Sequence, residues 1–135
     1  MKYFLNILVI VILAVVVYAA TFSVELEGIE NNGEGLAKIS SIKDRDNPRG
    51  QIRLYIDNLP VLEEDEVYEG WLVDTDTNYK LSLGIFTVKR SGKAYLTFKT
   101  ENYFDEYDSI VVTKEPFPDD NPGPSGEVVL IGDLE

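Results

Sequence analysis

Short alternating runs, rather than helical periods, dominate the chain after residue 21. No segment there repeats apolar residues with a 3.6-residue period over the roughly 11 residues that identify a helix. In one run, Ile52, Leu54 and Ile56 alternate with polar side chains or tyrosine, and residues 93–99 alternate in the same way. Strict alternation buries one face of a strand and leaves the other in water, so the pattern predicts an all-β domain.

Eight such runs predict eight strands, and they are separated by turn sequences rich in glycine, asparagine and aspartate. The expected strands are Phe22–Ile29, Gly35–Ile42, Gln51–Ile56, Val67–Asp74, Lys80–Val88, Lys93–Lys99, Ser109–Lys114 and Glu127–Ile131. Short strands at this spacing indicate an antiparallel β-sandwich or a barrel. We expect a sandwich, immunoglobulin-like or jelly-roll-like, because nothing in the sequence marks a ligand-lined lumen.

The first 21 residues have a different character. Lys2 is followed by an apolar run from Tyr3 to Ala20 that only Asn6 interrupts. Its length is at the lower limit for a membrane-spanning helix, and its small residues also suit cleavage of a signal peptide before Ala20. A buried core helix fits less well, because the run has no amphipathic stripe. We therefore predict a transmembrane anchor or signal peptide at 1–21. One domain at 22–135 would then lie outside the cell membrane, or be secreted if the signal is cleaved.

Composition excludes several classes of function. The chain has no cysteine and no histidine, which rules out disulfides, zinc sites of the usual kind and Ser-His-Asp or Cys-His nucleophiles. Its 24 acidic and 12 basic residues give a net charge of −12, which repels nucleic acid. We expect a non-enzymatic domain whose charge keeps it soluble or attracts a cationic partner.

The acidic stretch DTDTN spaces Asp74, Asp76 and Asn78 like the first ligands of an EF-hand loop. That loop also needs glycine at its sixth position and glutamate at its twelfth, where this chain has Tyr79 and Ile85. The EF-hand interpretation therefore fails. A hairpin turn explains the stretch better, and an irregular calcium site is the alternative.

Two further acidic stretches, EEDE and DEYD, supply Glu63 and Asp65, and Asp105 and Asp108. The simplest interpretation is that they are solvated loops. If both loops lie at one end of the sandwich, they could share a calcium ion, which prefers several carboxylate oxygens. Paired carboxylates also serve glycoside hydrolysis, but no aromatic-lined cleft accompanies these pairs.

The aromatic residues suggest a core and a surface. Trp71, the only tryptophan, lies on an expected central strand and is predicted to be a core residue, with surface sugar stacking as the alternative. Tyrosines could line a binding face or be ordinary sheet residues. The tyrosines in question are Tyr68, Tyr79, Tyr95, Tyr103 and Tyr107.

The proline-rich sequence EPFPDDNPGPSGEVVL lies between the last two expected strands. No two of its prolines are three residues apart, so it does not read as a polyproline ligand. We expect a rigid connection instead. Pro116 and Pro118 would end one strand, Pro122 and Pro124 would fix the crossing, and Gly126 would allow the turn into the last strand.

Four short motifs occur in order between residues 50 and 132. They are Tyr68-x-x-Trp71-Leu72, Leu83-Gly84-x-Phe86, Thr113-x-Glu115-Pro116 and Pro124-x-Gly126. In this order they resemble the extracytoplasmic C-terminal domain of the anti-sigma-K factor (RskA-type) family. The resemblance implies a sensory or scaffold domain coupled to a membrane span, and it brings no catalytic residues.

Full members of that family carry a cytoplasmic sigma-binding domain ahead of the membrane span, often with a zinc site. Few residues precede the apolar run here, and histidine and cysteine are absent, so we do not expect that domain. The predicted function is a membrane-anchored, extracytoplasmic, non-catalytic interaction or sensory domain. It would need no cofactor and would bind an unidentified protein or envelope partner. The alternative is a calcium- or glycan-binding structural protein of the cell envelope.

Overall fold

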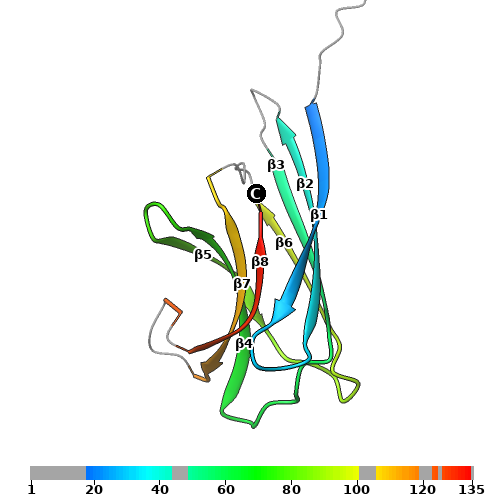
Figure 1. The fold of residues 1–135 in the computed structure, drawn as a ribbon, viewed down its shortest axis with the longest axis vertical. Helices are drawn as coiled ribbons and strands as arrows, with labels where there is room; N and C mark the ends of the chain where they lie inside the picture. The colour runs from blue at the N-terminus through cyan, green and yellow to red at the C-terminus, as the bar shows by residue number, and fades with distance from the viewer. Residues whose placement is uncertain (1–17, 44–48, 101–105, 119–122, 125, 135) are drawn as a thin grey trace, which may run out of the picture.

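The computed structural model in Figure 1 describes residues 18–43, 49–100, 106–118, 123–124 and 126–134. Every regular element in these ranges is a β-strand, which confirms the expected all-β class. The strands are β1 (Tyr18–Gly28), β2 (Glu34–Lys43), β3 (Arg49–Asp57), β4 (Glu66–Asp74), β5 (Tyr79–Phe86), β6 (Ala94–Thr100), β7 (Ser109–Pro116) and β8 (Glu127–Asp133).

The eight strands form one antiparallel sheet in the order β5-β4-β7-β8-β1-β2-β3-β6. β8 and β1 are paired only at Glu27–Ile131 and Gly28–Leu130, so the sheet divides into two four-stranded halves. The edge strands approach each other without pairing, and a Cβ on Gly84 of β5 would lie 3.6 Å from Leu96 of β6. The two halves thus enclose a common interior, as expected of a sandwich (Figure 1).

Side chains from both halves fill that interior. Ile52, Leu54 and Ile56 are buried, as their alternation predicted. In β6, Leu96 and Phe98 are half-buried and pack against the core, while the intervening side chains are exposed. Burial of each large aliphatic side chain contributes about 1.5–3 kcal/mol, so these alternating positions account for much of the fold's stability.

The strand boundaries differ slightly from the expected ones. β1 begins at Tyr18, inside the apolar run, because this part of the chain finds a partner along β2. The rest of the predicted anchor or signal, residues 1–17, lies outside the described residues. The described part of the chain contains no helix with the length and apolar character of a membrane span.

One part of the prediction for the proline-rich connection is confirmed, namely the end of the strand at Pro116. β7 ends at Pro116, and Pro124 is half-buried, while Pro122 lies outside the described residues. The role of Gly126 differs from the expected turn, because a Cβ there would lie 1.6 Å from the carbonyl oxygen of Lys114. The glycine therefore permits close approach of the chain to β7. The strand that follows, β8, lies between β7 and β1 and joins the two halves.

Candidate functional site

Three residues of the sequence motifs meet in one buried chain of hydrogen bonds. The indole Nε1–H of Trp71 on β4 donates to Thr113 Oγ1 on β7 at 3.0 Å. The Thr113 hydroxyl in turn donates to Glu115 Oε1 at 2.6 Å. All three side chains are at most 2% exposed. Buried polar groups are costly unless they are hydrogen-bonded, so each member of this chain depends on the next.

This chain lies on the opposite face of β7 from the main core. Ile110 and Val112 of β7 face the core, and Thr113 and Glu115 alternate with them. Trp71 is buried, as predicted, but it belongs to this second face rather than to the main apolar cluster. Both faces of the β4–β7 pair are therefore covered, which suits the nearly continuous apolar sequences of these strands.

A β-bulge joins the next motif to the same region. The β4–β5 register shifts between Gly70 and Trp71, and Leu83 is the extra residue on β5. Gly84, beside the bulge, has a φ of 117°, a conformation that side-chain-bearing residues rarely adopt. The bulge directs Leu83 into the core, so this motif is structural in its effect.

Tyr68 anchors β4 to the loop before it. Its ring stacks on Phe86 with centroids 5.6 Å apart, and its hydroxyl donates to the carbonyl oxygen of Pro60 at 2.7 Å. Burial, reinforced by the charge of Glu66, raises the pKa of Tyr68 to about 12. The side chain therefore stays neutral under physiological conditions and acts in packing.

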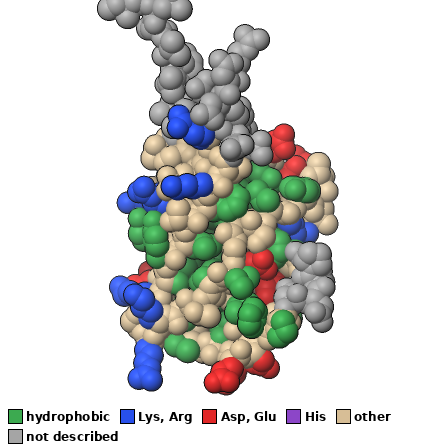
Figure 2. Space-filling view, turned by 180° about the vertical axis from the view of Figure 1, so that it is seen from behind, with side chains coloured by type: hydrophobic (Ala, Val, Ile, Leu, Met, Phe, Trp, Pro, Cys, Tyr) green, Lys and Arg blue, Asp and Glu red, His purple; other side chains and the backbone are tan. Residues whose placement is uncertain are grey.

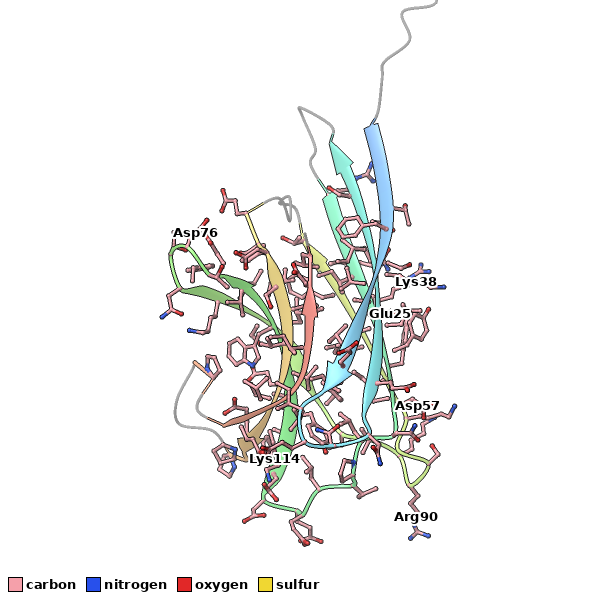
Figure 3. All side chains as sticks on the ribbon, in the orientation of Figure 1. Glu25, Lys38, Asp57, Asp76, Arg90 and Lys114 are labelled. Atoms are coloured by element: carbon pink, nitrogen blue, oxygen red, sulfur yellow. The ribbon has the colours of Figure 1, made fainter. Side chains whose placement is uncertain are left out.

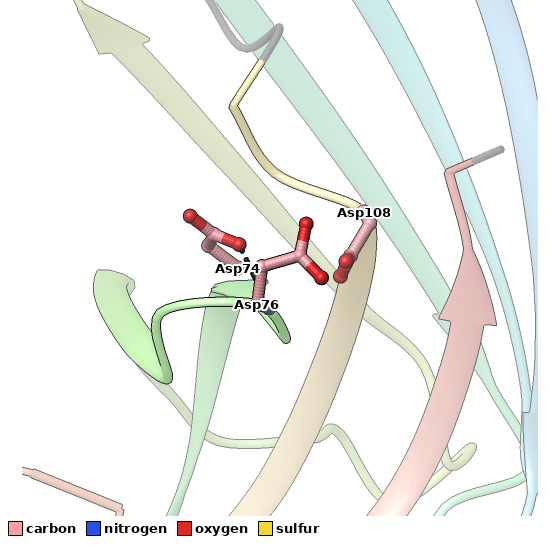
Figure 4. Close-up of side chains that lie close together, drawn as sticks. All are labelled: Asp74, Asp76 and Asp108. Atoms are coloured by element: carbon pink, nitrogen blue, oxygen red, sulfur yellow. Dashed lines mark hydrogen bonds between the residues drawn. The ribbon is translucent and has the colours of Figure 1, made fainter.

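A carboxylate cluster is the most chemically distinctive exposed feature (Figure 4). Asp74 is the last residue of β4, Asp76 lies in the turn that follows, and Asp108 lies just before β7. One carboxylate oxygen from each residue lies within 4.8 Å of the other two. Hard cations such as Ca²⁺ bind several carboxylate oxygens, so these three residues could hold one.

Local hydrogen bonds orient this cluster. The Thr77 hydroxyl donates to Asp74 Oδ2 at 2.8 Å, and the Asp76 N–H donates to Asp74 Oδ1 at 3.0 Å. The Thr77 bond is the main reason that the pKa of Asp74 is lowered. Asp108 accepts from the N–H of Thr75 at 3.2 Å and also from its hydroxyl. These bonds tie the β4–β5 turn to the start of β7, with or without a cation.

The family of the chain follows from comparison with known proteins. A family model described as "Anti-sigma-K factor rskA, C-terminal" matches residues 13–128. The chain belongs to this family. No curated protein and no solved structure matches it. Anti-sigma factors are regulatory rather than catalytic, are generally membrane-associated and act through a protein partner.

Two of the other predicted cation ligands of this RskA-type domain, Glu63 and Asp65, lie apart from the cluster. Glu63 and Asp65 precede β4, whereas Asp74 is its last residue and lies beside Asp108, so the EEDE loop and Asp108 are at opposite ends of that strand and cannot share an ion. Asn78 accepts a hydrogen bond from Lys80 at 2.9 Å. Asp105 lies outside the described residues. The grouping of Asp108 with Asp74 required the tertiary fold, since the two are far apart in sequence.

The tyrosines of the RskA-type domain divide into separate groups. Tyr68 is buried, which excludes it from any binding face, and Tyr103 lies outside the described residues. Tyr79 and Tyr107 have ring centroids 6.4 Å apart beside the aspartate cluster, and burial raises the pKa of Tyr107. Tyr95 lies elsewhere, beside a tyrosine of β3 that sequence analysis did not single out.

Proposed function

We propose that the chain is a membrane-anchored, extracytoplasmic interaction or sensory domain without catalytic activity. The carrying observation is the family match, which begins within the apolar segment and extends to Val128 in β8. The role of the motif residues supports the absence of catalysis. Trp71, Thr113 and Glu115 bond one another in a buried chain, rather than lining an open cleft.

The connection between the apolar segment and the sheet suits a sensory role. β1 begins at Tyr18, within the apolar run, and pairs with β2 from Tyr18 to Glu27. The sequence therefore leaves no polar linker between the proposed anchor and the domain. A partner that binds the sheet would act on the anchor through a paired strand, which transmits displacement better than a flexible linker does.

Cysteine labelling tests the topology, because the natural chain has no cysteine to interfere. Ser91→Cys places a thiol at an exposed position in the turn between β5 and β6, and Lys2→Cys places one before the apolar run. In spheroplasts, a membrane-impermeant maleimide should label the first variant and leave the second unlabelled until lysis. Protection of Ser91→Cys before lysis would reject the extracytoplasmic location. Mass spectrometry of the mature N-terminus would distinguish an anchor from a cleaved signal.

A second candidate function is calcium binding at the cell envelope. The observation that favours it is the convergence of Asp74, Asp76 and Asp108 within 4.8 Å. Asp76 is exposed and the other two are half-exposed, so any such site is open to solvent. Open sites with few ligands bind weakly, in the range of extracellular modules that respond to about 0.1–1 mM calcium.

A further inference from the structure

A basic, tyrosine-bearing surface covers the outer side of β2, β3 and β6. Strand register aligns Lys38 with Arg53, Tyr55 with Tyr95, and Gln51 with Lys99. All of these side chains except that of Gln51 are exposed, because the alternate residues of the same strands point into the core. We define the basic–tyrosine face as Lys38, Arg53, Tyr55, Tyr95 and Lys99.

The two tyrosines lie side by side at the centre of this face. Their ring centroids are 5.0 Å apart, with an interplanar angle of 49°. Tyr55 is 40% exposed and Tyr95 is 55% exposed, although both are large aromatic residues. The ammonium group of Lys38 lies 5.5 Å from the centroid of Tyr55, within the range of a cation–π contact. The pair thus offers ring surface and positive charge together.

The positive charges of the face have no acidic partners among the described residues. Lys38, Arg53 and Lys99 form no ion pair there, and Glu25, one register row from Lys38 on β1, does not pair with it. By contrast, Lys114 bridges to two glutamates. Lysine and arginine side chains follow this flank of the molecule in Figure 2, and Lys38 projects from it in Figure 3. Although the chain has a net charge of −12 and Glu25 and Asp57 border the face, its three cations form no ion pair within the described residues.

The chemistry of the face selects a polymer that carries both rings and negative charge. We infer that it binds an anionic polysaccharide, with sugar rings against Tyr55 and Tyr95 and acidic groups against Lys38, Arg53 and Lys99. Physiological salt screens carboxylates farther away than about 8 Å. Glu25 and Asp57 border the Tyr55 end of the face, so the acidic groups of the polymer would lie toward Arg53 and Lys99.

A hollow next to the tyrosines supports a sugar ligand. Its volume is about 860 Å³, and Tyr55, Asn32 and Asn58 line it together with Lys93 and four carboxylates. The carboxylates are those of Glu25, Glu27, Glu34 and Asp57, so this end of the face suits hydroxyl groups and not the acidic groups of the polymer. Amide and carboxylate oxygens accept hydrogen bonds from hydroxyl groups, which sugars carry in abundance. A chain lying across Tyr55 would place neutral, hydroxyl-rich units over the hollow and acidic units over the basic residues.

This inference rests on the proposed function, because only a domain outside the membrane reaches an envelope polysaccharide. The binding test itself does not depend on where the domain lies in the cell. Binding is measured with the purified full chain in detergent micelles, whatever its location in the cell. The probe is a hyaluronan oligosaccharide, with a neutral chitin oligosaccharide and poly-glutamate as comparisons. The full chain should bind hyaluronan most tightly, with an affinity that falls as salt is added.

Matched variants locate the binding. Lys38→Gln/Arg53→Gln/Lys99→Gln should abolish hyaluronan binding, and Tyr55→Ala/Tyr95→Ala should weaken it about tenfold. The variant Tyr55→Phe/Tyr95→Phe keeps the rings and should retain binding. The control Lys80→Gln/Lys89→Gln/Arg90→Gln removes the same charge elsewhere and should change the affinity less than about twofold. Thermal melts confirm that each variant is folded.

Several outcomes would overturn the inference. Absence of hyaluronan binding by the full chain would reject an anionic polysaccharide as the ligand. Equally tight binding of chitin would show that negative charge plays no part. Tighter binding to poly-glutamate would assign the face to an acidic protein. If the control variant lost as much affinity for hyaluronan as the variant that removes the three cations of the face, the net charge of the chain alone would explain the binding. A cysteine-labelling failure with intact hyaluronan binding would reject the extracytoplasmic location alone.

Discussion

The indole N–H of Trp71 donates a hydrogen bond to the hydroxyl of Thr113, 42 positions away in the sequence, at 3.0 Å. The same hydroxyl donates to Glu115, so a single threonine connects an aromatic side chain and a carboxyl group that are both buried. These residues belong to two of the motifs that characterise the family resemblance. Their association gives the two motifs a shared structural role in the buried layer between β4 and β7.

The first prediction concerns that threonine. Thr113→Val keeps the shape of the side chain but removes both hydrogen bonds, so unfolding should become easier by about 1–3 kcal/mol. Thr113→Ser keeps the hydroxyl group and should lower the free energy of unfolding by less than Thr113→Val does. Urea unfolding followed by Trp71 fluorescence measures both, since this is the only tryptophan. Equal losses in the two variants would show that packing, rather than hydrogen bonding, matters at this position.

The second prediction concerns alkaline stability. The pKa of Tyr68 is raised from 10.0 to about 12 in the folded domain, chiefly by burial. A pKa that is higher in the folded state contributes stability that is fully present below the pKa of the unfolded state. This stability is lost as the pH rises through the pKa of the folded state. The natural chain should therefore lose more stability between pH 10 and 12 than Tyr68→Phe does. Melting temperatures across this range test it, and parallel curves for the two proteins would contradict it.

The third prediction concerns calcium. At a free calcium concentration of 100 times the dissociation constant, the free energy of unfolding of the full chain should be about 2.7 kcal/mol higher than in the presence of a chelator. Asp76→Asn removes one ligand of the cluster and should abolish this response, while Glu64→Gln in the other acidic loop should preserve it. Without calcium, Asp76→Asn should melt slightly higher than the natural chain, because it relieves repulsion between carboxylates.

Thermal melts in millimolar calcium and in chelator measure this response. An unchanged melting temperature of the natural chain would reject a calcium site. A full response in Asp76→Asn would place the ion elsewhere in the chain. The hydrogen bonds of Asp74 and Asp108 with Thr77 and Thr75 would then be sufficient reason for the turn.

The fourth prediction concerns the proline-rich connection and β8. Deleting residues 116–135 removes the strand between β7 and β1, so the two halves lose their link and the domain should unfold. The milder change Gly126→Ala should destabilise the full chain, because its Cβ would overlap the backbone of Lys114. Glu127→Ala, at the neighbouring exposed position, is the control and should melt nearly as the natural chain does. A truncated chain with an unchanged melt would show that the segment is a dispensable tail.

Much of the fold could be predicted from local patterns. All eight expected strands are present, and the alternation at Ile52, Leu54 and Ile56 identified the buried face of β3. The alternation was less informative in β4, where Tyr68 and Trp71 are both buried on different faces. A continuous apolar run does not distinguish the two sides of a strand, and the bulge beside Gly84 changes the register there.

The candidate sites were harder to predict, because they join distant segments. Sequence analysis placed Asp74 and Asp76 in one acidic stretch and Asp108 in another, and did not predict that the two stretches meet. Tyr55 was not considered as the neighbour of Tyr95, since the β3–β6 pairing crosses two intervening strands along the chain. Residue types alone do not indicate which loops or strand faces meet.

The sequence by itself determined the class of the domain, its strands, the absence of histidine and cysteine chemistry, and the family resemblance. These properties depend on composition and on a two-residue period, which short segments carry alone. Only the tertiary structure decided that Trp71 bonds to Thr113, that Asp108 joins Asp74, and that the basic residues share a face with two tyrosines. Such contacts depend on strand order and register, which long-range packing of the whole sheet selects.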